Sequence, residues 1–274
     1  MSRELHGAVL SHAAASGSPA GWVAPVLLTG ALLGYLGLAV RGCRRGWRPW
    51  RLASFLLGAM LWGWALSPAF DAAADEDFGV HMAQHLLMAM LAPTALVLGA
   101  PVTVALRGLP PAQARLLGRL LRSRPAHVLA HPVTALVLSS GVLVALYFSP
   151  LYAATTTNPS LHALVHLHLA ASGYLFAWVI AGPDPAPQRP TVRTRLVVLG
   201  AAVAVHASVA QLLFAGLLVQ VHEPVGQMQA AGNLMYFGGD VAELLLAAAL
   251  LATWRPRRPG HSVATGEIAP RLSA

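Results

Sequence analysis

Seven long apolar segments, separated by short polar loops, constrain the fold of this chain of 274 residues more than any other feature. They lie at roughly residues 22–40, 52–68, 80–100, 131–149, 161–182, 196–220 and 232–253. Each is near the length of about 20 residues that a helix needs to cross a bilayer, although the second is short. Unbroken apolar runs favour helices over barrel strands, which alternate in polarity. We therefore predict an all-α integral membrane protein, a bundle of about seven transmembrane helices.

The distribution of charge predicts how this bundle is oriented. All 18 basic residues are arginines, and with seven spans every one except Arg3 lies on the same side of the membrane. The loops of the opposite side carry acidic residues, namely Asp71, Asp75, Glu76, Asp77 and Glu223. By the positive-inside rule the arginine side is cytoplasmic, so the N-terminus is outside and the C-terminus is inside.

The same segments predict one membrane domain with two short tails. We expect residues 1–20 to be a disordered extracytoplasmic tail, residues 21–254 to form the seven-helix domain, and residues 255–274 to be a disordered cytoplasmic tail. The arginines fit loops that meet anionic lipid headgroups, so no nucleic-acid partner is expected. A single cysteine, Cys43, excludes an internal disulfide and CxxC sites. No nucleophile elbow, phosphate-binding loop or HExxH motif is present, and we predict that the protein is not an enzyme.

Histidines enter the third segment from its outer end. The stretch DFGVHMAQHLLMAML has Asp77, His81 and His85 at every fourth residue, so one helix face carries a carboxylate and two imidazoles. A polar ladder of this kind is costly in a bilayer unless it faces protein, water or a metal ion. This segment is therefore predicted to carry function.

A second histidine motif opens the fifth segment, in the stretch SLHALVHLHLAASGYLF. His162 and His166 share one helix face, whereas His168 is turned by about 200° from His166 and cannot bind the same ligand from that side. One of these three histidines is therefore open to a structural hydrogen-bonding role.

The sixth and seventh segments add further polar groups. Asp240 and Glu243 are three residues apart on one face of the seventh segment, and His206 lies near the middle of the membrane on the sixth. At ~1.5 Å per residue, the residues that lie roughly 9–12 Å below the outer ends of their helices are His85, His166, His168 and Asp240. Polar groups thus gather in the outer half of the predicted bundle.

Imidazole together with carboxylate suits a transition metal such as copper, zinc or iron. The predicted metal ligands are His81, His85, His162, His166, His168 and Asp240, with Asp77, His206 and Glu243 as secondary candidates. The alternative interpretation is polar packing between helices, which we assign to His206 if it acts alone. Met82, Met88 and Met90 are possible soft copper ligands, but methionine at helical spacing usually faces lipid or the core.

Three stretches, HMAQHLLMAMLAPTALVLGAPV, LHALVHLHLAASGYLFAWVIAGPDP and GGDVAELLLA, resemble the CtaG family of multi-span bacterial cytochrome c oxidase assembly factors. The resemblance covers about residues 25–255. It implies a protein of the bacterial cytoplasmic membrane that helps to mature a haem-copper oxidase, with an oxidase subunit as partner and copper delivered to the buried CuB centre. The family's motifs map onto His81 and His85, onto His162, His166 and His168, and onto Asp240 and Glu243.

Other functions stay open at this point. The protein is alternatively a membrane electron carrier that binds quinol, or b-type haem through His85 and His166 as axial ligands. It is also compatible with a scaffold that holds an oxidase subunit without binding metal. A metal permease is less compatible, because the sequence offers no second buried site in the inner half of the membrane.

Overall fold

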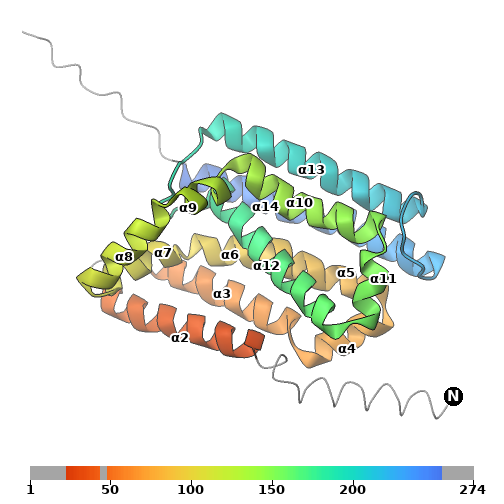
Figure 1. The fold of residues 1–274 in the computed structure, drawn as a ribbon, viewed down its shortest axis with the longest axis horizontal. Coiled ribbons are helices and arrows are strands. Elements are labelled where there is room, and N and C mark those ends of the chain that lie inside the picture. The colour runs from red at the N-terminus through yellow and green to blue at the C-terminus, as the bar shows by residue number, and fades with distance from the viewer. Residues whose placement is uncertain (1–22, 44–47, 255–274) are drawn as a thin grey trace, which may run out of the picture.

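The computed structural model describes residues 23–43 and 48–254, and within these residues it contains helices and loops but no strand (Figure 1). The all-α prediction is therefore confirmed for this part of the chain. The two predicted tails, residues 1–20 and 255–274, lie outside the described residues.

The described residues form long helices that run the length of the bundle and short helices at its two ends. The long helices are α2 (Val23–Cys43), α3 (Pro49–Ala65), α10 (Pro132–Phe148), α12 (Pro159–Ala181), α13 (Val192–Ala215) and α14 (Val225–Thr253). A further long helix is divided into α5 (Phe78–Leu86), the π-helical turn η2 (Leu87–Leu91) and α6 (Ala92–Leu98). The short helices are α4 (Pro68–Glu76), α7 (Pro101–Gly108), α8 (Pro111–Leu121), α9 (Arg124–Leu129) and α11 (Leu151–Thr157).

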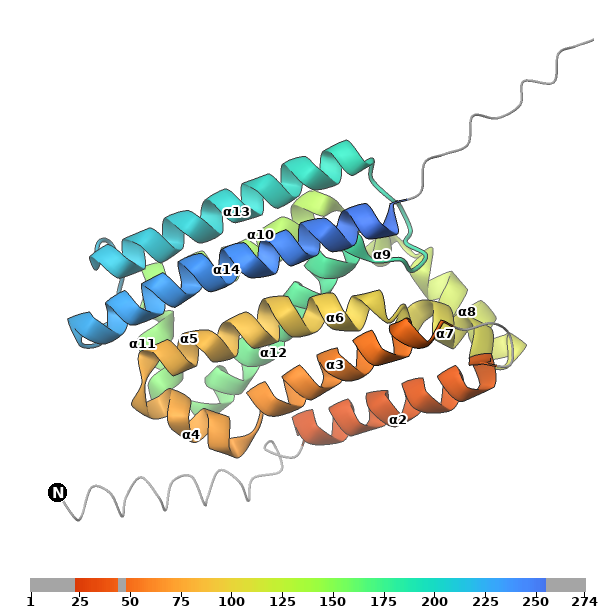
Figure 2. The same cartoon turned by 180° about the vertical axis from the view of Figure 1, so that it is seen from behind.

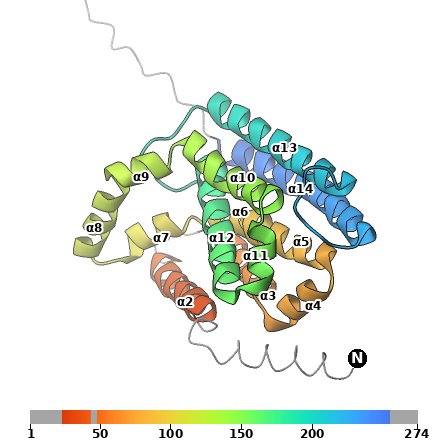
Figure 3. The ribbon, with the colours of Figure 1, turned by 45° about the vertical axis from the view of Figure 1, so that its right-hand side comes forward.

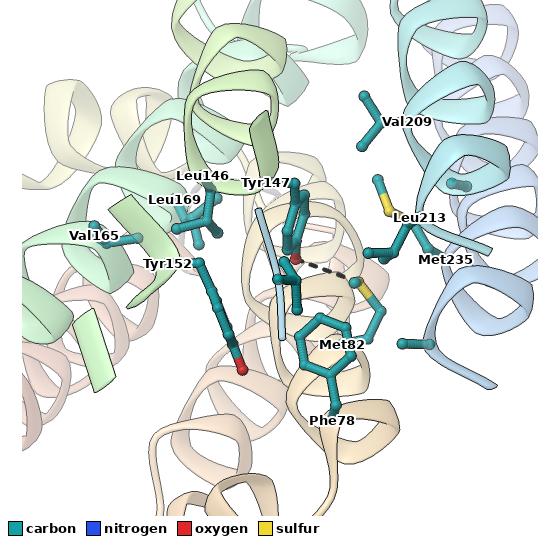
Figure 4. Close-up of a cluster of buried hydrophobic side chains, with 13 residues drawn as sticks. Phe78, Met82, Leu146, Tyr147, Tyr152, Val165, Leu169, Val209, Leu213 and Met235 are labelled. Atoms are coloured by element: carbon teal, nitrogen blue, oxygen red, sulfur yellow. Dashed lines mark hydrogen bonds between the residues drawn. The ribbon is translucent and has the colours of Figure 1, made fainter. Parts of the chain in front are cut away.

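Helix α12 lies in the middle of the bundle. It packs against α6, η2, α10 and α14, and it passes through the centre of the molecule in each view (Figures 1, 2 and 3). Figure 2 shows α2, α3, the α5–α6 helix, α14 and α13 side by side. The buried side chains fall into clusters around this arrangement, and the one in Figure 4 joins α5, α10, α12, α13 and α14.

The two ends of the bundle differ in charge. Helices α7, α8 and α9 lie at one end, called here the arginine end, and carry Arg107, Arg115, Arg119, Arg122 and Arg124. Helices α4 and α11, with the loop 216–224, lie at the opposite end, called here the acidic end, which carries Asp71, Asp75, Glu76 and Glu223 (Figures 1 and 2). The structure thus keeps the segregation of charge on which the predicted orientation depends.

The length and composition of the helices indicate a membrane protein. Four elements in the described residues are long and apolar enough to cross a bilayer: Phe78–Gly108, Pro159–Ala181, Val192–Ala215 and Val225–Thr253. Two bent pairs, α3 with α4 at 53° and α10 with α11 at 79°, raise the number to six if each forms one span. A serine–proline step lies at each of the two bends. Proline disfavours helical geometry in the residue before it, so the first helix of each pair ends there and the chain changes direction. The first of the seven predicted segments forms α2, which is not among these six.

The break in the third predicted segment has a local cause. In η2 the N–H of Ala92 donates to the carbonyl of Leu87, five residues back, and Pro93 then has no N–H to offer. The carbonyl of Met88 instead accepts a hydrogen bond of 2.8 Å from Trp62 Nε1 on α3. Because π-helical turns frequently occur at functional sites, this one directs attention to the residues that precede it.

Candidate metal centre

Four histidines from two helices converge near the acidic end. Ring centroids are 4.3 Å apart for His81 and His85 on α5, and 4.1 Å apart for His162 and His166 on α12. Across the two helices, the centroids of His85 and His166 are 5.5 Å apart, and those of His81 and His162 are 6.1 Å apart. His81, His85 and His166 are buried, and His162 is half-buried. The two sequence motifs therefore form one cluster, called here the four-histidine pocket.

The two helices present these histidines in the same way. Asp77 is the N-cap of α5 and accepts a hydrogen bond from Val80 N–H, and Asn158 is the N-cap of α12 and accepts from Ser160 and Leu161 N–H. In each helix the histidines follow the cap by four and eight residues, which places both rings on one face in the first turns. Capping therefore fixes where each helix starts and so where its histidines point.

The pocket is small and partly open. Its cavity volume is about 10 Å³, and Leu146, Thr155 and Val165 complete the lining around the four rings. Tyr152 of α11 packs edge-on against His81, with ring centroids 5.8 Å apart, and its hydroxyl donates to Glu223 of the loop 216–224 at 3.2 Å. The bent helix α11 and this loop thus cover the pocket at the acidic end.

His85 is oriented by a buried tyrosine. The Tyr147 hydroxyl lies 3.3 Å from His85 Nδ1 and donates its proton to the sulfur of Met82 at 3.7 Å (Figure 4). In the arrangement that satisfies both contacts, His85 donates from Nδ1–H to the tyrosine oxygen. The neutral ring then has its lone pair on Nε2, which is the nitrogen available to a ligand.

Two nitrogen atoms of the pocket have no hydrogen-bond partner among the described residues, His85 Nε2 and His166 Nε2. Leaving a buried polar atom unpaired costs about 1–3 kcal/mol, so each of them requires an explanation. Within residues 23–43 and 48–254, no group of three or more His, Cys, Asp or Glu side chains is already arranged to hold a metal ion. The pocket thus offers unpaired imidazole nitrogens, and rotation of the side chains would be needed to direct them at one ion.

Two predicted ligands lie outside this pocket. The exposed Asp77 caps α5, where its carboxylate accepts a hydrogen bond from Val80 N–H. His168 faces α10, where its Nε2 is 3.1 Å from the carbonyl of Leu138, as expected from its rotation away from His166. The structure therefore gives both residues hydrogen bonds to the backbone.

The polar residues of α13 and α14 form a separate group. His206 Nδ1 is 3.5 Å from the Glu243 carboxylate, and both side chains are buried. The ring of His206 lies so close to Gly239 that a Cβ atom there would collide with it. Asp240 is half-buried beside this pair. These three predicted candidates thus lie together, but not in the four-histidine pocket.

Sequence reasoning missed three polar residues that hold the site and the bundle in place. Tyr147 gave no signal, because it lies inside the apolar run of α10. Gln84 is buried between the two histidines of α5, and its amide donates to the Ala65 carbonyl at 2.7 Å and to the Asp71 carboxylate at 2.5 Å. These hydrogen bonds fix α5 against the end of α3 and against α4.

The third missed residue, Asp184, lies at the arginine end in the GPDP stretch that was noted only as part of a motif. Its fully buried carboxylate accepts hydrogen bonds from Val102 N–H at 3.1 Å, Thr103 N–H at 2.7 Å and the Thr103 hydroxyl at 2.6 Å. Arg189 donates to its backbone carbonyl. Burial raises the pKa of Asp184, while the hydrogen bonds from Thr103 and Val102 oppose that shift. The residue joins the loop after α12 to the start of α7.

Comparison with known proteins gives a family and several relatives. The family model described as cytochrome c oxidase caa3 assembly factor (Caa3_CtaG) matches residues 33–257. The uncharacterised protein Mb0105 of Mycobacterium bovis is 36% identical over 189 residues, which are 66% of this chain and 28% of that protein. The uncharacterised protein ML1998 of Mycobacterium leprae is 34% identical over 184 residues, 64% of this chain and 28% of that protein. The chain thus spans less than a third of the length of these relatives. No solved structure matches it significantly.

Proposed function

This chain belongs to the family of cytochrome c oxidase caa3 assembly factors, and we propose that it binds copper in the four-histidine pocket during assembly of a haem-copper oxidase. The observation that carries the proposal is the pair of buried, unpaired nitrogens, His85 Nε2 and His166 Nε2, in a pocket that two helices build from histidines. A bound metal ion would use the lone pairs of both atoms and remove the cost of burying them unpaired.

The donor set fits copper. Neutral imidazole is a favoured ligand of copper, zinc and iron, and a hydrogen bond to the other ring nitrogen orients such a ligand and raises its basicity. For His85 that hydrogen bond comes through Nδ1 and Tyr147. His81, His85, His162 and His166 would hold the ion, and the rest of the chain would keep water and competing ligands away from it.

The proposed topology brings metal in from the outer side. With α2 counted as a span there are seven, and the positive-inside rule then directs the arginine end to the cytoplasm. The four-histidine pocket, at the acidic end, lies near the outer surface below α11 and the loop 216–224. Copper arriving outside the cytoplasmic membrane would reach His162, the half-buried member of the cluster, first. The role is non-catalytic: the protein holds the ion, and an oxidase subunit receives it.

The size of the pocket favours a metal ion over a haem group. Sites for organic ligands usually have about 300–1,000 Å³, whereas the cavity between the four rings is only about 10 Å³. A porphyrin between His85 and His166 would need these helices to separate. A quinol would meet the same restriction in this pocket.

A genetic experiment separates copper delivery from scaffolding. In cells that lack the natural protein, we would express the wild type, His85→Ala with His166→Ala, and the matched control His127→Ala with His131→Ala from α9 and its junction with α10. We expect the first double variant to leave an oxidase subunit that co-purifies with the protein but lacks copper, while the control supports a copper-loaded oxidase. A fully active oxidase with the His85/His166 variant, at equal protein level, would replace copper delivery with the scaffold function.

A further inference from the structure

A second cavity shares His85 with the four-histidine pocket. It has a cavity volume of about 60 Å³, is partly open, and lies among α5, η2, α6, α10, α12, α13 and α14, where it extends from His85 to His206 and Glu243. His85 lines both spaces, so the two adjoin at this residue. The sequence alone indicated no such second space.

The lining of this cavity has an unusual share of sulfur. Three of the seven methionines of the chain, Met82, Met90 and Met235, line it together with the imidazoles of His85 and His206. Met82 and Met235 are almost fully buried, and Figure 4 shows them projecting from α5 and α14 into the same region of the core. Thioether sulfur is a soft ligand that selects monovalent copper, and imidazole also binds copper.

We propose that this cavity is a second metal site, for a soft monovalent cation such as Cu(I), held by methionine thioethers and His206 and balanced in charge by Glu243. The inference rests on the proposed function, because it extends the path of the same ion beyond the four-histidine pocket. It assigns a binding role to methionines that the sequence alone would place in the core.

The charge balance supports this assignment. Four neutral imidazoles supply no negative charge, and a cation in a medium of low dielectric constant is costly unless a counter-charge is near. The helices that line the cavity contain two carboxylates in their sequence, Asp240 and Glu243, and Glu243 lines the cavity itself. A cation that passes His85 would therefore move toward the side chain that compensates its charge.

The surroundings of Glu243 hold it ready for this role. The buried His206 ring is packed against Gly239, where no side chain larger than hydrogen fits, and its Nδ1 lies 3.5 Å from the carboxylate. Ser139, Ser140 and Ser172 add hydroxyl groups to the same lining. Polar groups thus face the cavity from α10, α12, α13 and α14.

Silver(I) titration of the detergent-purified protein tests the proposal, because Ag(I) is a soft monovalent ion. We expect two bound equivalents in the wild type and one in Met90→Leu with Met235→Leu, which leaves the contact between Tyr147 and Met82 in place, with loss of the sulfur signal in X-ray absorption. Leucine conserves the volume of methionine, so the variant should fold. The matched control, Met88→Leu with Met228→Leu, changes two buried methionines outside the cavity and should keep both equivalents. Glu243→Gln should weaken the cavity site about ten- to a hundredfold.

The outcomes separate this inference from the proposed function. His81→Ala with His162→Ala changes residues that line only the four-histidine pocket, so it should lose the other equivalent. One equivalent in the wild type, lost in that variant, would overturn the second site and leave the proposed function intact. Two equivalents in Met90→Leu with Met235→Leu would overturn a thioether site and indicate that the cavity holds a different class of ligand. No bound Ag(I) in the wild type would overturn both.

Discussion

Replacing Tyr147 by phenylalanine tests how His85 is held. The substitution removes one hydroxyl, which contacts His85 Nδ1 at 3.3 Å and Met82 Sδ at 3.7 Å, and leaves the buried ring in place. His85 Nδ1–H then has no acceptor, and the cost of one unpaired buried donor is about 1–3 kcal/mol in the free energy of unfolding. The proton is also free to move to Nε2, which removes the lone pair intended for the metal. Loss of such an orienting partner typically lowers metal affinity about ten- to a hundredfold.

The assay is Cu(I) affinity by competition with a chromophoric chelator, together with thermal unfolding in the same detergent. The matched control is Tyr152→Phe, which also removes one tyrosine hydroxyl near the pocket, but one that donates to Glu223. We expect Tyr147→Phe to lower both affinity and stability, and Tyr152→Phe to leave the affinity unchanged. Equal affinities in Tyr147→Phe and the wild type would refute the argument that Tyr147 sets the tautomer of His85.

The remaining predictions concern packing and the ends of the helices. Gly173→Ala should destabilise the protein by about 1–3 kcal/mol, because the new Cβ would collide with the backbone of Ala89 in η2; unchanged thermal unfolding would contradict that contact. His168→Ala should lower stability by about 1 kcal/mol through the lost hydrogen bond to Leu138 but leave copper stoichiometry unchanged, and a lost equivalent of copper would make His168 a ligand. Asp184→Ala should cost about 2 kcal/mol or more, because two backbone N–H groups at the start of α7 lose their acceptor; copper affinity, measured in parallel, should not change.

Helical periodicity was sufficient to predict that the four histidines of the pocket occur as two pairs, each on one face of its own helix. A spacing of four residues places His81 with His85 and His162 with His166, and the rotation of His168 away from them follows from the same geometry. That both pairs lie near the same end also followed from the order of the segments. Their meeting across α5 and α12 depends on the central position of α12, which no local pattern specifies.

Other features of the site depend on packing and could not be predicted from spacing. Asp240 was grouped with the histidines because it lies at a similar depth along its helix axis. Depth does not determine the direction in which a side chain points around that axis. On α14 it is Glu243 that contacts His206. Spacing also did not indicate that Asp77 caps α5, a role that depends on where the helix begins. Length and composition support between four and six spans in the described residues: the bends after α3 and α10 leave four or six, and α2 is not among them. Serine–proline steps at both positions are the signal that was available for them.

Metal content and optical absorption of the detergent-purified protein, measured after incubation with Cu(I), test the central claim most directly. The comparison is between the wild type, His85→Ala with His166→Ala, and the control His127→Ala with His131→Ala. The account predicts bound copper without a haem absorption band in the wild type and the control, and the loss of one equivalent of copper in the His85/His166 variant, which remains folded. Equal copper in all three proteins, or no copper in any of them, would contradict it.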